Sequence, residues 1–539
     1  RNNTIDSLLV LTLLLAAWAF IRATETGKLR HLLLGALIVG LGFNIKMLQA
    51  YLALPAFFAL YLLGARVGWW RKIWQLAVAG IVVLAVSFSW ALAVDLTPPS
   101  QRPYVGSSTD NTVTELIIGH NGLSRLLGRG RTSISLGNSS QQQPGGSGGD
   151  ADQATRPQGP DGANDGTQMT PPQMTGGTDG SNSQASRRPQ PPSGAGQRPS
   201  GSGPGGQPPD GGGGMGGNEI GQAGWLRLVS SPLSNEVSWL LPFGLLGVAL
   251  LSVGSRLRLP VEPRHQALVL WGGWLGTELV FFSMASFFHA YYLTMLAAPL
   301  AALVGMAATE LWRMRERRPR IAIGLLLLAA TGTLAAQYAM AGSYVSDRWW
   351  APIAVAALAI GALLLFIAQR HQLAPLARAG FGLAVAATLV TPLVWSTLTT
   401  TDPSPNARLP HAYAGSSGRG GGGQSRNGDQ VDTSLISFLE ANTQDVEYLV
   451  AVPSANEGDV YVLATGRPVL YMGGFSGSDS VVSADDLAQM VDSGKLRYVL
   501  WGGDQRGNSD LSNWIASHAT IVAGFDQVGG RGTTLYELR

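Results

Sequence analysis

The chain contains no cysteine among its 539 residues. Disulfide bonds, thiolate metal sites and cysteine nucleophiles are therefore excluded. Charged residues are scarce as well: they make up 13% of the chain, against about a quarter in soluble proteins, while 45% of the residues are hydrophobic. The formal net charge of +3 gives no reason to expect a polyanionic partner, so we expect no binding to nucleic acid. This composition is typical of a membrane protein.

Signatures of soluble enzymes are also missing. The sequence has no HExxH metal pattern, no serine elbow, no histidine-rich cluster and no heptad seam. It begins without a methionine, in RNNTIDSLLVLTLLL, and lacks the basic start and the small-residue cleavage site of a signal peptide. We expect a fragment whose N-terminal part is missing.

Apolar runs that approach the ~20 residues needed to cross a membrane recur along most of the chain. Ten of them lie at 7–21, 32–45, 47–63, 73–93, 237–254, 266–284, 291–309, 321–341, 350–369 and 379–397. Alternate linkers between the runs are basic. They carry Arg22, Lys28 and Arg30; Arg66, Arg71 and Lys72; Arg256, Arg258 and Arg264; the arginines of RMRERRPR (313–320); and Arg370 and Arg378. Because positive charge favours the cytoplasmic side, we predict that these linkers lie inside and the alternate loops outside.

The predicted fold class is mainly α, a multi-span protein of the cell membrane with a small C-terminal α/β domain outside it. Transmembrane helices are expected over 1–94 and 237–397. Between them, 95–236 forms an extracytoplasmic loop, whose Gly/Pro/Gln-rich part at 137–217 is too polar to bury a core and is predicted to be disordered. A glycine-rich linker at 398–430 leads to the extracytoplasmic domain at 431–539.

Short β-rich runs and helical patterns alternate in this last domain, which indicates a small α/β sheet. The predicted strands lie at 448–452, 468–475, 496–503, 519–525 and 533–538, and the predicted helices at 432–442, 484–493 and 510–518. The motif GGFSGSD (473–479) matches neither a Walker A pattern nor a full GxGxxG. We interpret it as a structural glycine turn, with a ligand loop as the alternative.

Lys46 stands in an otherwise apolar stretch, GLGFNIKMLQAYLALP, two residues after Asn44. A charge at the bilayer centre costs at least about 2.5–3.5 kcal/mol, so such a residue has a function or reaches water. The topology puts Lys46 at the outer face. A single helix over 32–63 would be about 48 Å long, so two helices that meet near 44–47 fit better. Lys46 either snorkels to the interface or takes part in a site there.

Other polar residues are predicted at the same face. In SFFHAYYLTMLAAPLAALVG, Tyr291 and Tyr292 suit an interfacial aromatic belt, and His289 can donate a hydrogen bond to phosphate or bind metal. Three arginines precede the disordered segment: Arg102, Arg125 and Arg129. Together with Lys46 they would form a cationic rim suited to a lipid-linked phosphate.

Asp6, in RNNTIDSLLV, stands at the outer start of the first apolar run. An acid at this position is explained by the helix dipole, which favours negative charge at a helix N-terminus. The alternative is a catalytic role, as a general base that acts on a hydroxyl or amine acceptor.

Several segments together carry a family resemblance. GLGFNIKMLQAYLALP resembles a glycine-rich span that ends in GLxFLTKG, RNNTIDSLLVLTLLLAAWAF resembles an arginine-then-aspartate start to an early span, and FHAYYLTMLAAPLAALVG resembles HPYYxxxLAPxxAAL. These patterns are those of polytopic lipid-dependent glycosyltransferases of the glycosyltransferase 39 type, such as dolichyl-phosphate-mannose protein mannosyltransferases and aminoarabinose transferases. RPYVGSSTDNTVTELIIGHNGLSRLLG and SWLLPFGLLGVAL resemble a bacterial subgroup with a glycine-rich outer loop and a C-terminal soluble domain.

The resemblance implies a GT-C fold and an inverting transfer of a sugar from a polyprenyl-phosphate carrier to an acceptor protein or glycan on the outer face. It implies that Lys46 binds the carrier phosphate, that His289 and Tyr292 line the same cavity, and that Asp6 is an acidic active-site residue. The further candidate substrate contacts are Asn44, Tyr291, Arg102, Tyr104 and Asn121. In this family the main catalytic carboxylate lies in an outer loop before the span that begins this chain, so we expect this fragment to lack the main catalytic loop.

Two departures from the family pattern stand out. Asn44-Ile45 replaces a pair that ends in threonine before the lysine, and His289-Ala290 replaces His-Pro. Phosphate binding tolerates the first change, because the lysine supplies the charge. The second change removes a proline, so the family pattern does not predict the backbone conformation at His289-Ala290.

Other functions remain open on the sequence alone. The chain could be a non-catalytic membrane anchor that presents its C-terminal domain to an envelope partner, a reading that does not require the polar residues to share one face. A transporter or lipid flippase would tend to show internal repeats and broken mid-membrane helices, and we find neither. We expect no soluble cofactor and assign no metal site, although a divalent metal is possible in the family.

Overall fold

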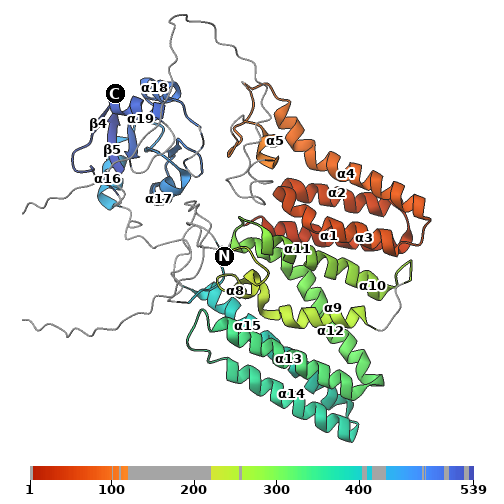
Figure 1. The fold of residues 1–539 in the computed structure, drawn as a ribbon. Coiled ribbons are helices and arrows are strands. Elements are labelled where there is room, and N and C mark those ends of the chain that lie inside the picture. The colour runs from red at the N-terminus through yellow and green to blue at the C-terminus, as the bar shows by residue number, and fades with distance from the viewer. Residues whose placement is uncertain are drawn as a thin grey trace, which may run out of the picture. The chain divides into compact units, whose positions relative to one another are not determined.

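The computed structural model is a mainly helical protein with one small sheet (Figure 1). It describes residues 4–99, 101–108, 111–118, 220–253, 258–402, 410–415, 432–475, 477, 479, 481–502, 509–526, 528 and 533–539. The predicted disordered segment 137–217 lies outside these residues, as do Arg125 and Arg129. The predicted fold class, a multi-span helical protein with a small C-terminal sheet, is confirmed.

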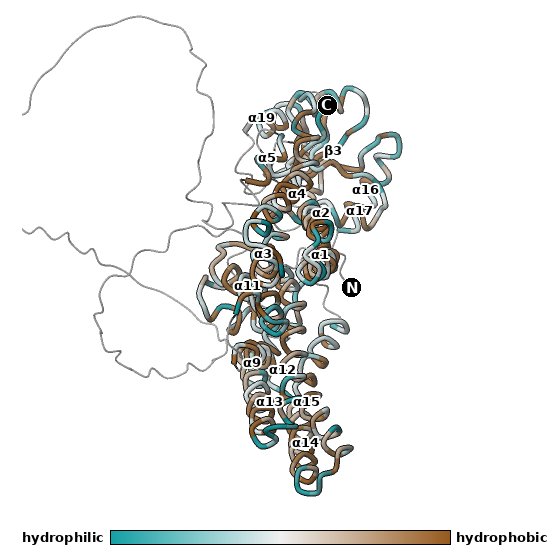
Figure 2. The backbone as a smooth tube through the Cα atoms, turned by 90° about the vertical axis from the view of Figure 1, so that its right-hand side faces the viewer, coloured by the Kyte–Doolittle hydropathy of each residue, from teal (hydrophilic) through white to brown (hydrophobic). Residues whose placement is uncertain are grey.

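Nine helical segments of the described chain are long and apolar enough to cross a membrane. They are Asp6–Thr26, Leu29–Leu52, Trp69–Asp95, Ser234–Ser252, Pro263–Met284, Ala290–Arg317, Pro319–Ala341, Ala351–His371 and Ala374–Thr401. In Figure 2 the hydrophobic colour dominates along these helices. All nine overlap runs expected from the sequence, because length and hydropathy alone determine such runs.

The first group of helices consists of α1 (Asp6–Thr26), α2 (Leu29–Lys46), α3 (Leu54–Gly64) and α4 (Trp69–Asp95). α2 packs between α1 and α4, and α3 packs against α1 (Figure 1). Their buried faces form one core that includes Leu13, Phe20, Phe43 and Phe57. We call the end of this bundle where α1 begins and α2 ends the Lys46 end, and the opposite end the Lys28 end.

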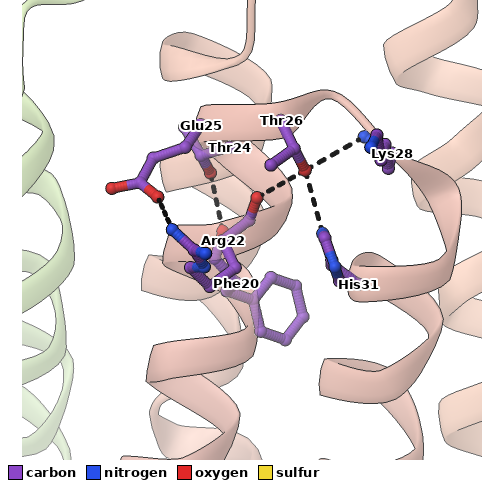
Figure 3. Close-up of polar contacts among 7 residues, drawn as sticks. All are labelled: Phe20, Arg22, Thr24, Glu25, Thr26, Lys28 and His31. Atoms are coloured by element: carbon purple, nitrogen blue, oxygen red, sulfur yellow. Dashed lines mark hydrogen bonds and ion pairs between the residues drawn. The ribbon is translucent and has the colours of Figure 1, made fainter.

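A tight turn joins α1 to α2 at the Lys28 end (Figure 3). Gly27 ends α1 in the left-handed region, at φ 63°, and donates its N–H to Ala23 O. A Cβ atom at Gly27 would lie 2.7 Å from Val67, so glycine is required both for its conformation and for its size. The Thr26 hydroxyl lies 2.9 Å from His31 Nδ1, which ties the end of one helix to the start of the next. The turn therefore sets α1 and α2 antiparallel.

The expected run 47–63 differs from a regular helix. The chain forms a 3₁₀ helix, η1 (Met47–Leu52), before α3 begins at Leu54. α3 by itself extends only about 16 Å, too short to span a bilayer. The Thr277 hydroxyl donates to the Leu52 carbonyl at 2.7 Å and so satisfies the end of η1 from another helix. The break near 44–47 expected from the sequence is thus present, and its cause lies at Met47.

The second group contains the remaining long helices. They are α9 (Leu241–Ser252), α11 (Gly273–Met284), α12 (Ala297–Arg317), α13 (Pro319–Ala341), α14 (Ala351–His371) and α15 (Ala374–Thr401), with α10 (Pro263–Ala267) and the π-helical η5 (Leu268–Gly272) leading into α11. α12 packs against α9 and α13, and α14 packs against α15. Leu275, Phe282, Leu303 and Leu326 belong to their shared core.

The C-terminal region, described by itself, is an α/β domain with a five-stranded sheet in the order β2-β1-β3-β5-β4. The strands are β1 (Ala451–Val452), β2 (Leu470–Tyr471), β3 (Tyr498–Gly502), β4 (Ala519–Ile521) and β5 (Thr533–Leu538), and the helices are α16 (Thr433–Asn442), α17 (Ala455–Thr465), α18 (Ala484–Asp492) and α19 (Ser509–His518). β1 runs parallel to β2 and β3, and β5 runs antiparallel to β3 and β4. The sequence prediction lacked α17, whose Val-Tyr-Val segment favours a strand.

The glycine-rich motif after β2 is a structural turn. Gly474 and Gly477 have φ of 69° and 86°, which other residues rarely adopt. A Cβ atom at Gly473 would lie 2.6 Å from the Gly477 carbonyl oxygen. Gly474 O accepts the N–H of Ala455, which begins α17. These close backbone contacts account for the glycines by packing, as the interpretation as a structural turn expected.

Glycine also sets the distance between α9 and α12. A Cβ atom at Gly247 would overlap the carbonyl oxygen of Leu303, whereas one at Gly305 of α12 would meet nothing within 4 Å. Gly247→Ala should therefore push the two helices apart and destabilise the protein by about 1–3 kcal/mol. Gly305→Ala is the matched control and should leave the melting temperature unchanged or slightly raise it. Thermal unfolding of both variants in detergent tests this, and equal melting temperatures would contradict it.

Candidate functional site at the Lys46 end

Lys46 ends α2 because the next residue breaks the helix. Met47 has φ 36° and ψ −134°, a conformation that glycine adopts easily and other residues rarely do. Such a residue costs on the order of 1–3 kcal/mol and persists only where its surroundings enforce it. Its consequence is a cation on the final turn of α2, where the helix dipole favours positive charge.

Asp6, the first residue of α1, meets Lys46 across the antiparallel helix pair. Lys46 Nζ donates to Asp6 Oδ1 at 2.5 Å. The Asp6 side chain is 1% exposed and that of Lys46 13% exposed, so this ion pair is largely shielded from solvent. Asp6 lies in the first turn of α1, where the helix dipole favours a negative charge. The dipole alone does not explain why Lys46 lies against this carboxylate. The structure therefore joins two residues that the sequence suggested separately.

A third segment closes over the lysine. η6 (Ala290–Leu296) is a 3₁₀ helix that begins directly after His289, and Tyr292 N–H donates to His289 O at 2.9 Å. This short turn places Tyr292 so that Lys46 Nζ lies 3.5 Å from the centre of its ring, and 5.0 Å from that of Tyr291. A desolvated cation over an aromatic face gains about 2 kcal/mol or more.

His289 belongs to the same aromatic cluster. Its ring stacks on Tyr291 at 5.5 Å with an interplanar angle of 5°, and meets Tyr292 edge to face at 5.6 Å. The two tyrosine rings themselves are 4.8 Å apart. The structure thus brings together five of the residues suggested by the sequence: Asp6, Lys46, His289, Tyr291 and Tyr292. We call these five the Lys46 cluster.

Two buried polar atoms near Lys46 have no hydrogen-bond partner among the described residues. One is Asp6 Oδ2, the carboxylate oxygen that does not bind Lys46. The other is Gln49 Nε2. Gln49 belongs to η1 and follows Lys46 by three positions along the chain. Gln49 is not among the residues predicted from the sequence, although a polar residue three positions after the lysine in an apolar run was the available signal. Buried polar atoms normally have partners, so these two are candidates for ligand contacts.

Asn44 lies outside the cluster. Its side-chain Nδ2 donates to Gly40 O at 3.1 Å and to Val86 O at 2.9 Å, so it links α2 to α4. It also lines a shallow groove between these two helices, together with Leu41, Ser89, Trp90 and Ala93. Its suggested contact with substrate stays a prediction.

Arg102 orders the loop that follows α4. Its guanidinium donates to the backbone carbonyls of Asp95 at 2.7 Å, Thr97 at 3.1 Å and Asn111 at 3.2 Å. The Asp95 carboxylate in turn accepts the N–H of Val113 at 2.7 Å at the start of α5 (Val113–Glu115). These bonds show what holds the loop, and the assignment of Arg102 to a phosphate-binding rim stays a prediction.

Tyr104, in the same loop, has half of its surface exposed. Asn121 lies outside the described residues. Substrate contacts for both therefore stay predictions. Among the residues that the structure describes, no three His, Asp or Glu side chains gather in a way that could hold a metal ion.

The Lys46 cluster contains groups of the kind that bind anions in other proteins. A primary ammonium has three N–H donors, and the contacts with Asp6 and Tyr292 fix its position before any ligand arrives. A phosphate oxygen accepts such a donor strongly, and preorganised positive charge is effective where water is largely excluded. Aromatic rings and an unpaired carboxylate oxygen beside it suit the apolar faces and hydroxyl groups of a sugar.

Comparisons with known proteins concern the chain as a whole. Residues 1–91 match the family described as "Dolichyl-phosphate-mannose-protein mannosyltransferase", and residues 435–518 match that described as "Putative mannosyltransferase YkcB-like, C-terminal". Two proteins of Bacillus subtilis (strain 168) are similar over nearly the whole chain. "Putative mannosyltransferase YkcB" is 36% identical, over 97% of this chain and 74% of its own, and "Putative mannosyltransferase YycA" is 34% identical, over 99% and 78%. No solved structure matches.

The Asp6–Lys46 pair should be energetically coupled. Removing one partner of a buried pair costs about 3–5 kcal/mol, because it leaves the other charge unpaired. Asp6→Asn and Lys46→Met should each destabilise the protein, and the double variant should lose clearly less than the sum of the two. Unfolding of all four proteins in mixed micelles measures the coupling.

The exposed pair Arg22–Glu25, at 3.0 Å and about half exposed on both sides, is the control. Its cycle with alanine variants should give less than about 1 kcal/mol. Equal coupling for the two pairs would show that burial adds nothing to the interaction of Asp6 with Lys46.

Proposed function

Because the chain belongs to the dolichyl-phosphate-mannose-protein mannosyltransferase family of multi-pass membrane glycosyltransferases, we propose that it takes its sugar from a polyprenyl-phosphate carrier. The acceptor in this proposal is a protein or a glycan at the outer face of the membrane. The observation that carries it is the position of Lys46, a shielded cation at the end of a transmembrane bundle. A lipid-linked phosphate lies at this depth, next to the bilayer surface.

Lys46 acts on the phosphate in this proposal. In an inverting transfer, an acceptor hydroxyl oxygen attacks the anomeric carbon while the bond from that carbon to the phosphate oxygen breaks. The polyprenyl phosphate leaves with the bonding electrons, and the acceptor proton passes to a general base. Negative charge therefore grows on the phosphate, where a fixed ammonium stabilises it.

Asp6 positions Lys46 and also faces the substrate. Its Oδ1 holds the ammonium, and its Oδ2 is free to accept a hydrogen bond from a hydroxyl of the sugar or acceptor. Tyr292 covers the other side of the ammonium, and His289, stacked on Tyr291, supplies a further hydrogen-bonding group. The aromatic faces suit the C–H faces of a hexose or pentose. Gln49 joins these residues as a candidate contact through its unpaired Nε2.

The distribution of basic residues supports the outer face as the side of the reaction. The turn that contains Lys28 and the region of Arg264 lie at the end opposite to Lys46, and Val261 N–H donates to Leu63 O at 2.9 Å there. Basic residues favour the cytoplasmic side, which puts the Lys46 end outside. α15 ends at Thr401 on the Lys46 side, so the C-terminal domain follows on the outer side in this proposal.

The alternative function, a non-catalytic membrane anchor, does not explain why the charged and aromatic residues of the Lys46 cluster are buried together. A buried ion pair is at best weakly stabilising compared with apolar residues of similar size. A helix pair that served only as an anchor would be stable without it. The burial of this pair against an aromatic cluster therefore favours the transferase.

Replacing Lys46 tests the proposed function directly. Lys46→Ala should lower sugar transfer by about 10²–10³-fold, the effect of losing one preorganised donor, while the protein still inserts into the membrane. Lys46→Arg should retain part of the activity, since it keeps the charge. The measurement is transfer from radiolabelled polyprenyl-phosphate mannose in membranes that contain the full-length protein. Lys28→Ala, an exposed cation of the opposite end, is the matched control and should transfer normally. Normal transfer by Lys46→Ala would remove Lys46 from the site.

A further inference from the structure

A short turn next to the Lys46 cluster exposes large apolar side chains. Residues 224–229 lead into η3 (Arg227–Val229), and within them Trp225 is 74% exposed and Leu226 is 73% exposed. Val229 is 40% exposed, and Met284, at the end of α11, is 60% exposed. Single exposed apolar side chains are common, but several that lie together mark an interaction surface.

Arg227 fixes the turn to the end of α11. Its side chain is 5% exposed and donates to Ala285 O at 2.6 Å and Phe282 O at 3.3 Å. It also donates to Ile220 O at 2.8 Å and Gly221 O at 2.9 Å. The last carbonyls of a helix lack partners within it and carry partial negative charge, so a guanidinium is well placed there.

A backbone bond adds to this attachment. Gly224 N–H donates to Ser283 O at 2.9 Å, one residue before α11 ends at Met284. The exposed turn therefore lies within one residue of the end of a candidate membrane span, Pro263–Met284. Its position along the bundle is that of a membrane interface rather than of a loop that extends into water.

The chemistry of the segment fits lipid rather than protein. From Ile220 to Leu233, Arg227 is the only charged residue, and it is buried. Tryptophan is the side chain most favoured at the boundary between headgroups and acyl chains, where one part of the ring is apolar and the N–H meets water. Leucine beside it supplies purely apolar surface. A protein partner would be expected to meet polar side chains on the turn, and within 224–229 the exposed side chains offer only the indole N–H.

We propose that the turn 224–229 is a membrane-interface anchor, in which Trp225 and Leu226 insert between lipid headgroups at the Lys46 end. Arg227 connects this anchor to the loop that follows α11 through its hydrogen bonds to Phe282 O and Ala285 O. That loop continues through Phe288, whose ring lies 5.0 Å from the Arg227 guanidinium, to His289 of the Lys46 cluster. The anchor thus holds His289 at a constant depth relative to the bilayer surface. This inference concerns lipid contact and does not depend on the proposed transfer reaction.

The absence of cysteine makes the test direct, because single cysteines can be labelled without removing native ones. Leu226→Cys with a nitroxide label, in the full-length protein in phospholipid vesicles, should show high accessibility to oxygen and low accessibility to a water-soluble nickel complex. Leu463→Cys is the matched aqueous control, since Leu463 is 85% exposed on the C-terminal domain. Leu363→Cys, at a 57% exposed position of α14, is the lipid reference.

Two results would overturn the proposal. Accessibility to the nickel complex at 226 equal to that at 463 would place the turn in water. Low accessibility to both reagents would mean that protein covers it, from the C-terminal domain or from a second copy of the chain. The role of Arg227 is tested with the same label in Arg227→Lys, which has fewer donors. Its spectrum should show greater mobility at 226, and an unchanged spectrum would contradict the attachment to α11.

Discussion

The ion pair between Asp6 and Lys46 is the interaction on which the Lys46 end depends. Asp6 begins α1 and Lys46 ends α2, so the two antiparallel helices must pack in one register for the charges to meet. Neither charge would be stable alone at this degree of burial. Tyr292 then contributes a ring from a segment far along the chain, which ties the first helix group to the second. The same small set of contacts therefore links the register of α1 and α2 to the candidate site at this end.

Length and hydropathy predicted the nine candidate spans of the described chain but wrongly added a tenth at 47–63, and a polar residue next to an apolar run was sufficient to single out Asp6, Lys46 and His289. The contact between Asp6 and Lys46 could not be predicted, because it depends on helix register, which the periodicity of two uniformly apolar helices leaves open. The 3₁₀ form of the segment after Met47 was missed for a related reason: its sequence is as apolar as a helix, and the deviation comes from backbone strain at one residue. The charge of Arg102 could be read from the sequence, but the backbone carbonyls to which it donates could not, because they depend on the fold of the loop after α4.

Both proposals concern the Lys46 end of the molecule: one concerns binding of the substrate and the other contact with lipid. In the first proposal, the fixed cation, the unpaired carboxylate oxygen of Asp6 and the aromatic faces of the Lys46 cluster bind a lipid-linked sugar. In the second proposal, the turn at Trp225 and Leu226 holds the loop of His289 at the level of the bilayer surface. A donor whose phosphate is confined to that surface needs a binding site at a matching depth. The glycine-rich turn of the C-terminal sheet domain is explained by the domain's own backbone packing.

The most direct test of the central claim is binding of a polyprenyl phosphate without a sugar, because it isolates the role of Lys46 from catalysis. Its affinity should be measured with the purified full-length protein and with Lys46→Met in nanodiscs, with Arg22→Ala as the control at the opposite end. Loss of one charge-assisted contact should raise Kd at least about tenfold, which corresponds to about 1.4 kcal/mol, while the control binds as the unchanged protein does. Equal affinity of Lys46→Met and the unchanged protein would contradict a phosphate site at Lys46.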